Sequence, residues 1–403
     1  GGASLPERSG RSQPHVTAIQ DATFLICPDS FKESLTASEA AAAIRDGLSR
    51  ACRGFRFHLT PISDGGEGFV EAMLSDGGRR VEALVTGPLG SPVSASYGIL
   101  TDGSTAVIEM AAAAGLGLVP PEARRPLEAT TRGVGELMLD ALSRGARRLL
   151  IGIGGSATTD GGAGMAQALG VRLLDAQGNE IPAGGGGLLK LERIETSGLD
   201  PRIRQVSIRV ACDVKNPLLG ERGAAAVYAP QKGATPEQVA LLEQGLTRLA
   251  EVAMRDLGTD PSDVPGAGAA GGLGWGLMAF CGAELVPGFQ LVADALGLEK
   301  RAGEADWIVT GEGRTDATSL QGKVVGGVLE IVRRTGRPCV VLCGSVGPDS
   351  APLYEAGATA VLSIVQGPAS LPEALKDAGR LLEDAAYNLG RLIAASRPEQ
   401  EEQ

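Results

Sequence analysis

Four short loops in this sequence place carboxylates beside glycine, basic or amide residues, and each follows a predicted strand. They contain Asp29, Ser30 and Lys32; Asp64 and Glu67; Asp213, Lys215 and Asn216; and Glu312, Arg314 and Asp316. Gln231 and Lys232 form a fifth polar set. One such loop is usually a solvated turn, but five together suit phosphoryl transfer. That reaction needs cations around the phosphate oxygens, carboxylates for Mg²⁺ and backbone N–H groups around the phosphates.

A glycine-rich stretch, 152–165, lies between a predicted strand at 147–151 and a helix that begins near residue 163. Glycine lets the backbone approach a ligand closely, and a helix N-terminus adds N–H groups and partial positive charge. The stretch therefore predicts a phosphate-binding loop, although a tight turn without a ligand is the alternative. The predicted cofactor-binding residues are Gly154, Gly155, Ser156, Thr158, Asp160, Gly161 and Gly162.

Composition excludes several other functions. The net charge of −11 argues against nucleic acid as a partner, and no apolar run reaches the roughly 18 residues that a membrane span needs. With only two histidines, histidine triads and histidine-ligated metals are not expected. The six cysteines form no CxxC pair, so we expect reduced thiols in a cytoplasmic protein.

The order of predicted elements indicates an α/β protein with two domains. Strands at 23–27 and 55–62 alternate with helices, which favours a Rossmann-like parallel sheet with ligands at the carboxyl ends of its strands. Strands at 79–86, 93–100 and 105–110 follow one another through short turns, which favours antiparallel pairing in a second, mixed α/β domain. The predicted divisions are a flexible extension at 1–21, a discontinuous Rossmann-like domain at 22–80 plus 285–396, a second domain at 81–284, and an acidic tail at 397–403.

Eight motifs together resemble the bacterial type I glycerate kinase family, and they occur in that family's order. They are the stretches 28–34, 64–68, 153–158, 160–165, 211–214, 230–234, 265–274 and 311–314. The resemblance implies two α/β domains with the active site in the cleft between them. It also implies phosphorylation of D-glycerate that depends on ATP and Mg²⁺ and yields 2-phosphoglycerate and ADP. Four places depart from the family's pattern, namely Phe69, Ala114, Thr159 and the stretch 317–321.

Under that resemblance each charged loop receives a role. Arg314, helped by Ser30, is expected to bind the substrate carboxylate, because arginine binds carboxylates in a bidentate way. Lys32 and Lys232 are expected to balance the charge of the transferring phosphate. Asp213 is the preferred proton acceptor, with Asn216 close by in the substrate site.

Two other carboxylates stay open as proton acceptors, Asp64 and Asp316. Glu312 and Asp64 are the expected Mg²⁺ ligands, partly through water. These roles could permute without changing the reaction.

Alternative functions remain open at this stage. The kinase could produce 3-phosphoglycerate or act on a related hydroxy acid. A loose dinucleotide fingerprint, Gly152-x-Gly154-x-x-Ala157 with Asp175 further on, allows a nicotinamide-dependent oxidoreductase. A protein that binds an anion without catalysis is a third possibility. The chain is expected to be a monomer or a homodimer.

Overall fold

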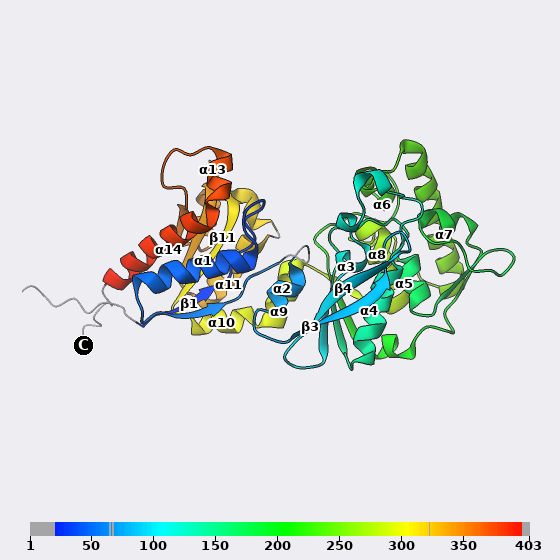
Figure 1. The fold of residues 1–403 in the computed structure, drawn as a ribbon, viewed down its shortest axis with the longest axis horizontal. Coiled ribbons are helices and arrows are strands. Elements are labelled where there is room, and N and C mark those ends of the chain that lie inside the picture. The colour runs from blue at the N-terminus through cyan, green and yellow to red at the C-terminus, as the bar shows by residue number, and fades with distance from the viewer. Residues whose placement is uncertain (1–20, 64–65, 67, 322, 397–403) are drawn as a thin grey trace, which may run out of the picture.

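The computed structural model of the chain describes residues 21–63, 66, 68–321 and 323–396. Figure 1 shows two lobes side by side, each built on its own β-sheet, with the helices α2 (Phe69–Met73) and α9 (Gly288–Leu296) between them. One sheet is parallel throughout and the other is mixed. The predicted fold class, an α/β protein with a Rossmann-like parallel sheet and a second mixed α/β part, is confirmed.

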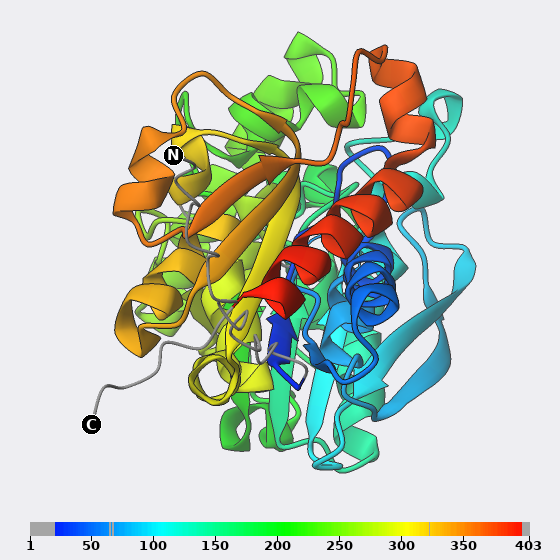
Figure 2. The ribbon, with the colours of Figure 1, turned by 90° about the vertical axis from the view of Figure 1, so that its left-hand side faces the viewer.

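The first lobe contains a five-stranded parallel sheet in the order β13-β12-β11-β1-β2. Its alternating side chains supply two separate cores: Phe24 and Ile26 pack under one face, whereas Leu25 and Cys27 pack under the other. In Figure 2 the helices α1 and α14 lie side by side over one face of the sheet. The strands are β1 (Thr23–Ile26), β2 (Arg56–Leu59), β11 (Trp307–Thr315), β12 (Cys339–Val346) and β13 (Ala360–Ser363). The helices are α1 (Ala37–Ala51), α10 (Leu298–Glu304), α11 (Val324–Thr335), α12 (Ala351–Glu355), α13 (Leu371–Lys376) and α14 (Ala378–Ala395).

The second lobe contains a six-stranded mixed sheet in the order β10-β9-β6-β5-β4-β3. The pairs β3–β4 and β4–β5 are antiparallel, as the short turns predicted, and the remaining pairs are parallel. The strands are β3 (Arg79–Thr86), β4 (Pro92–Ile99), β5 (Thr105–Glu109), β6 (Arg148–Gly152), β9 (Ser207–Ala211) and β10 (Glu284–Val286), and a separate hairpin joins β7 (Arg172–Leu174) to β8 (Arg193–Glu195). The helices are α3 (Ala111–Ala114), α4 (Arg132–Ser143), α5 (Ala163–Ala168), α6 (Ala224–Tyr228), α7 (Pro236–Leu257) and α8 (Ala269–Cys281).

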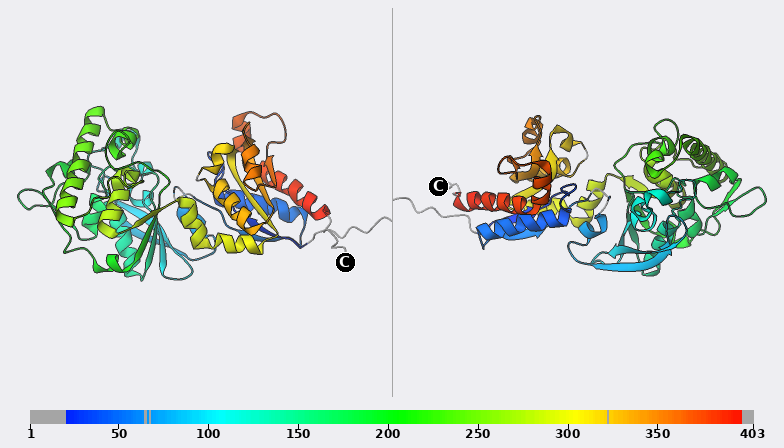
Figure 3. Two further views of the ribbon diagram at one scale, coloured as in Figure 1. Left: turned by 180° about the vertical axis from the view of Figure 1, so that it is seen from behind. Right: turned by 45° about the horizontal axis from the view of Figure 1, so that its top comes forward.

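The two lobes share one hydrophobic core. Residues of α2 and α9, among them Phe69 and Phe289, cluster with Val107, Leu150 and Ala211 of the six-stranded sheet and with the underside of the parallel sheet. Both views in Figure 3 show the lobes meeting in this region. Burial of this apolar surface is what attaches one lobe to the other.

Several elements differ from the sequence prediction. The sequence predicts one helix over 371–395, but Asp377 divides this segment into α13 and α14. It also predicts a strand at 306–310, and that strand continues to Thr315 as β11. Residues 266–271 match GxGxxG but follow a polar loop, which argues against a dinucleotide site; they lead into α8, where Ala270, Gly271 and Gly272 have left-handed backbone angles. The domain boundaries predicted from the sequence stay predictions.

Candidate active site

A turn at the carboxyl end of β6 exposes backbone to a cavity. Gly154 and Gly155 are exposed, and Gly155 has a φ of 74°, which favours glycine. Ser156 follows and is 7% exposed. The turn is held from one side by the α3 region, where Leu116 N–H donates to Gly155 O at 2.8 Å and Ala157 N–H donates to Ala114 O at 2.9 Å.

Lys232 reaches this turn from beneath. The side chain lies after α6 and is 3% exposed, yet it carries an ammonium group. Its Nζ donates to Ser156 Oγ at 3.0 Å and to Thr158 O at 2.5 Å. Burial lowers the pKa of Lys232 to about 7, while the nearby Asp160 opposes that shift. A buried amino group that can carry a positive charge is thus held against the same loop that exposes its backbone to the cavity.

Asp160 holds the start of α5 and does not face the cavity. Its carboxylate is fully buried and accepts N–H bonds from Thr131 at 2.9 Å and from Gly162 and Gly164 at 3.1 Å each. The hydroxyl of Thr131 donates to it as well. Burial raises the pKa of Asp160, although these hydrogen bonds oppose the shift. The N–H groups that we expected a helix terminus to offer to phosphate are therefore used inside the protein.

Gly161 and Gly162 lie under the turn and are packed against helices. A Cβ on Gly161 would lie 2.4 Å from Leu249 Cδ2 of α7, and one on Gly162 would lie 3.1 Å from Gly276 Cα of α8. Both have positive φ. These two glycines let the loop settle onto α7 and α8, so they support the turn from below.

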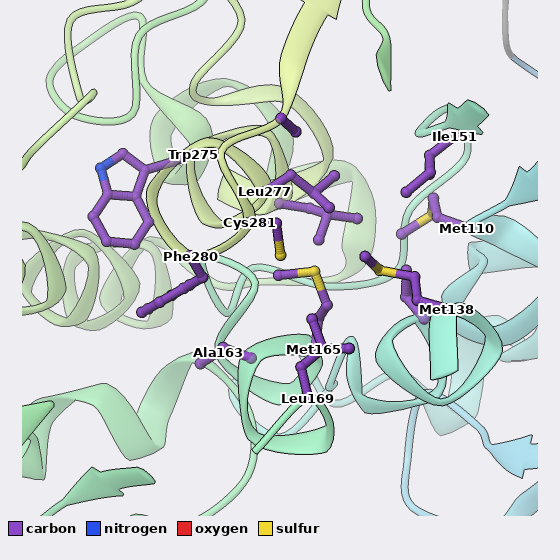
Figure 4. Packing of buried hydrophobic residues seen from close by; sticks show 14 of the residues in the cluster. Met110, Met138, Ile151, Ala163, Met165, Leu169, Trp275, Leu277, Phe280 and Cys281 are labelled. Atoms are coloured by element: carbon purple, nitrogen blue, oxygen red, sulfur yellow. The ribbon is translucent and has the colours of Figure 1, made fainter. Parts of the chain in front are cut away.

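The left-handed start of α8 forms part of the same support. A Cβ on Gly271 would lie 1.9 Å from Thr158 O, which is also the acceptor of Lys232. Below this contact Figure 4 shows Met165 of α5 pointing toward Cys281 of α8 and toward Met138 of α4. The apolar core of the second lobe therefore fixes the position of the glycine turn.

A cavity of about 430 Å³ opens at the carboxyl ends of β6 and β9. Of the sequence-predicted residues, it brings together Gly154, Gly155, Ser156, Asp213 and Lys232. Other parts of its wall are largely apolar, and they include Leu116, Ile153, Cys212, Val214 and Tyr228.

Asp213 lies at the rim of the cavity and is exposed to solvent. Its Oδ1 accepts the N–H of Gly288, the first residue of α9, at 3.0 Å. Asp213 therefore stands where the second lobe meets the helix that leads into the first.

The side chain of Asn216 is used to shape the rim. It donates to Arg222 O at 2.8 Å and accepts the hydroxyl of Tyr228 at 2.7 Å. The structure thus gives Asn216 a role in holding Tyr228 against the cavity, and its predicted contact with substrate stays untested.

A second set of polar residues lies at the carboxyl edge of the five-stranded sheet. The chain runs outward from β1 to β2 on one side and to β11 on the other, so the crevice for ligands in this fold class lies between β1 and β11. Asp29 N–H donates to Gly311 O at 2.9 Å and joins the two loops there. Lys32 is exposed on this edge, and Ser30 lies half-buried beside Asp29.

Glu312, Arg314 and Asp316 occupy the end of β11 and the turn after it. Glu312 is 7% exposed, and burial raises the pKa of its carboxyl group. Arg314 is exposed and its Nε lies 3.4 Å from Asp316 Oδ2. Asp316 caps the short helix that follows, where its Oδ1 accepts the Thr318 hydroxyl at 2.6 Å and the Thr318 N–H at 2.9 Å, and these two bonds lower its pKa. Arg314 is therefore the more available of the two charges.

The predicted metal ligands are only partly described. Asp64 and Glu67 lie outside the described residues. Within the ranges that the structure describes, no group of three histidine, cysteine or acidic side chains could hold a metal. Mg²⁺ in kinases is bound by one or two carboxylates together with phosphate oxygens and water, and the buried carboxyl group of Glu312 can supply one such ligand.

Sequence reasoning missed two features of the site. One is Tyr228, which lies two residues before Pro230 and belongs to no recognisable motif. The other is Thr131, which precedes α4 and binds Asp160; it lies 29 residues away in sequence and becomes a neighbour only in the fold. The interpretation of the glycine stretch as a dinucleotide-binding loop is weakened. Asp175, the acidic residue that this interpretation needs, accepts the N–H groups of Gln177 and Asn179 within its own turn.

Two α/β lobes, with a glycine turn beside a buried lysine on one and acidic and basic loops on the other, are the arrangement expected of a small-molecule phosphotransferase. The family model of the glycerate kinase family matches residues 24–394, so the chain belongs to that family.

Comparisons with individual proteins agree with this. The chain is 48% identical to the glycerate kinase of Bacillus subtilis over 93% of this chain and 98% of that protein. It is 49% identical to the glycerate 2-kinase of Escherichia coli over 92% and 97% of the two chains. A crystal structure from Salmonella typhimurium LT2, provisionally assigned as glycerate kinase 2, matches with a TM-score of 0.84 and 48% identity over 93% of this chain and 99% of that one. None of the helices in the described part of the chain combines the length and apolar character of a membrane span.

Proposed function

We propose that this kinase transfers the γ-phosphoryl group of ATP to the 2-hydroxyl of D-glycerate and yields 2-phosphoglycerate and ADP. The observation that carries the proposal is the buried Lys232 ammonium, bonded to Ser156 and Thr158 behind a glycine turn that lines a cavity. A cation and exposed backbone on one surface suit the phosphates of a nucleotide. The relative named as a glycerate 2-kinase supports the choice of the 2-hydroxyl.

The glycerate site in this proposal lies on the first lobe. Arg314 binds the carboxylate, since its guanidinium is exposed and forms a surface ion pair with Asp316. Ser30 and Lys32 stand on the neighbouring loop, across the hydrogen bond from Asp29 to Gly311. All three residues lie at the edge where an open α/β sheet binds its ligands.

Asp213 is the proposed proton acceptor. In the transfer step the 2-hydroxyl oxygen forms a bond to the γ-phosphorus, the bond from that phosphorus to the bridging oxygen of ADP breaks, and the hydroxyl proton passes to the carboxylate. Asp213 suits this step because it stands at the cavity rim and beside α9, between the two proposed half-sites. Asp316 remains the second candidate, although its cap bonds favour a structural role.

Magnesium, when bound with ATP, would shield the negative charge of the phosphates. Glu312 of the first lobe is the described carboxylate we propose to hold it, with phosphate oxygens and water completing the shell. A divalent cation bound there would favour the charged form of this buried carboxyl group, against the effect of burial.

The two proposed half-sites lie on different lobes, so we propose that the lobes approach each other when both substrates are bound. Such closure would exclude water from the γ-phosphate and limit wasteful hydrolysis. We also propose a cytoplasmic setting, which all six free cysteines support. Whether the enzyme is a monomer or a homodimer stays a prediction.

The test is ³¹P NMR of a reaction that contains the purified protein, ATP, Mg²⁺ and D-glycerate. A new resonance of 2-phosphoglycerate together with ADP is expected. A 3-phosphoglycerate resonance would keep the kinase and overturn the regiochemistry. Unchanged ATP and D-glycerate, with protein shown by circular dichroism to be folded, would overturn the proposal.

A further inference from the structure

The cavity of the second lobe is too large for D-glycerate, the proposed phosphoryl acceptor, alone. Its volume of about 430 Å³ equals the space of roughly fourteen molecules of liquid water, and a three-carbon acid would leave most of it empty. Pockets of this size accommodate larger organic ligands with extensive apolar surface. The cavity therefore has room for a ligand with a bulky apolar part in addition to a phosphate.

The wall of the cavity has two chemically distinct parts. Lys232, Ser156 and the two exposed glycines form a polar, cationic part. Leu116 and Tyr228 belong to the part that is mainly carbon. Leu116 is bonded through its N–H to Gly155 O at 2.8 Å, so one apolar residue directly adjoins the turn.

Tyr228 is held in place as part of this wall. The ring stands at the last residue of α6, half-buried, and the hydroxyl donates to Asn216 Oδ1 at 2.7 Å. Asn216 is anchored in turn by its bond to Arg222 O. A ring fixed in this way loses little entropy when a flat ligand packs on it. Aromatic residues are rare in this chain, at 3% of the sequence, and this one lines the cavity.

We propose that the nucleoside part of ATP occupies the apolar part of this cavity and that its base packs against Tyr228 and Leu116. This inference rests on the proposed function and extends it by assigning the whole nucleotide to the second lobe. The glycine turn and Lys232 then contact the phosphates, and the first lobe is left for the acceptor. Packing of a base on an aromatic ring contributes enough affinity that its loss weakens binding by roughly tenfold.

Isothermal titration calorimetry with ATP and with inorganic tripolyphosphate tests the assignment. Tyr228→Leu is expected to weaken ATP binding roughly tenfold and to leave tripolyphosphate binding within about twofold of the unsubstituted protein. Tyr354→Leu, which alters an exposed tyrosine on α12 of the other lobe, is the matched control and should change neither. Equal weakening of both ligands by Tyr228→Leu, or of neither, would overturn the inference.

Two further results separate the parts of the argument. Tyr228→Phe keeps the ring and removes the bond to Asn216, so a tenfold loss in this variant would assign the effect to the hydroxyl and overturn the base subsite. A steady-state Michaelis constant that rises for D-glycerate and not for ATP in Tyr228→Leu would place the acceptor in the cavity, which also overturns it. If the unsubstituted protein binds no ATP while folded, the proposed function itself fails.

Discussion

The glycine turn of the second lobe and the β1 and β11 loops of the first lobe carry similar residue types in opposite settings. Lys232 is 3% exposed and bonded to two oxygens of a buried loop. Lys32 is exposed, and Arg314 has a side chain that is 68% exposed and paired with one carboxylate at 3.4 Å. The proposed nucleotide half-site is thus built into the core, whereas the proposed D-glycerate half-site depends on charges in solvent.

This difference indicates where each half-site obtains its binding energy. A preorganised group in a dry environment loses little reorganisation energy when the ligand arrives. Exposed charges interact weakly until a ligand and a closing lobe exclude water from them. We therefore expect substitutions in the second lobe to affect both folding and activity, and substitutions in the first lobe to affect mainly acceptor binding.

The largest expected effect is on folding, at the glycines of the two regions. Gly271→Ala would place a Cβ 1.9 Å from Thr158 O at a φ of +65°, and we expect a loss of more than about 4 kcal/mol in the free energy of unfolding. Gly313→Ala on β11 would meet no atom nearer than the 3.6 Å contact with Lys32 N, so its loss should stay within about 1 kcal/mol. Urea denaturation measures the free energy of unfolding of each variant. A similar loss in the two variants would show that the two regions are not packed differently.

The next effect is on catalysis, at the two lysines. Lys232→Met preserves bulk but removes the ammonium group behind the turn, and kcat/KM for ATP should fall by about 10²- to 10³-fold. Lys32→Met in the exposed loop should cost roughly tenfold, because water screens that charge. Steady-state kinetics compares the loss of kcat/KM in the two variants, after circular dichroism has confirmed that both are folded. A smaller loss for Lys232→Met than for Lys32→Met would reverse the proposed assignment of the phosphate site.

Part of this comparison could be read from the sequence. Hydrophobic runs at 23–27 and 79–86 predicted the strands, and the rule that parallel strands present ligands at their carboxyl ends predicted which loops gather. The end of β11 was not predicted correctly, because the strand continues through the motif at 311–314 to Thr315. These inferences depend on local pattern and on chain direction, both of which are present in one sequence.

The burial of individual polar residues could not be predicted in this way. Asp160 resembles a phosphate-loop residue, but Leu249 and Gly276 from distant helices cover the loop beneath the turn, and the carboxylate became a cap for α5. Ala270 has a φ of 53°, which no propensity would assign to alanine. Such features arise from contacts between α5, α7 and α8, so they require the assembled fold.

Acceptor binding should depend on Arg314 with little effect on folding. Arg314→Gln removes the charge proposed to bind the carboxylate, and the Michaelis constant for D-glycerate should rise by roughly 30- to 100-fold while that for ATP changes less than threefold. The melting temperature should stay nearly constant, because exposed ion pairs contribute under about 1 kcal/mol. Arg380→Gln on α14, which removes another exposed arginine, is the control. A rise confined to the ATP constant would assign Arg314 to the nucleotide.

The buried lysine should also make stability depend on pH. Burial lowers the pKa of Lys232 from 10.5 to about 7, so between these values the unfolded chain binds more protons than the folded one. The free energy of unfolding contributed by this group therefore rises as pH increases above 7. Denaturation of the unsubstituted protein and of Lys232→Met from pH 7 to pH 9 should show curves that diverge, with the unsubstituted protein gaining stability relative to the variant. Parallel curves would mean that the ammonium keeps its ordinary pKa in the fold.

The smallest expected effect concerns a hydroxyl that the second lobe leaves unsatisfied. Thr159 is fully buried, and its Oγ1 has no hydrogen-bond partner among the described residues. Thr159→Val keeps the shape and removes the buried polar atom, so the free energy of unfolding should stay constant or rise by up to about 1 kcal/mol. The adjacent Thr158→Val is the matched comparison, because Thr158 Oγ1 lies 3.2 Å from Ser156 Oγ and its loss should destabilise the turn. Since both residues are fully buried, a loss of stability in Thr159→Val equal to that in Thr158→Val would show that this hydroxyl, too, belongs to the bonded network around Lys232.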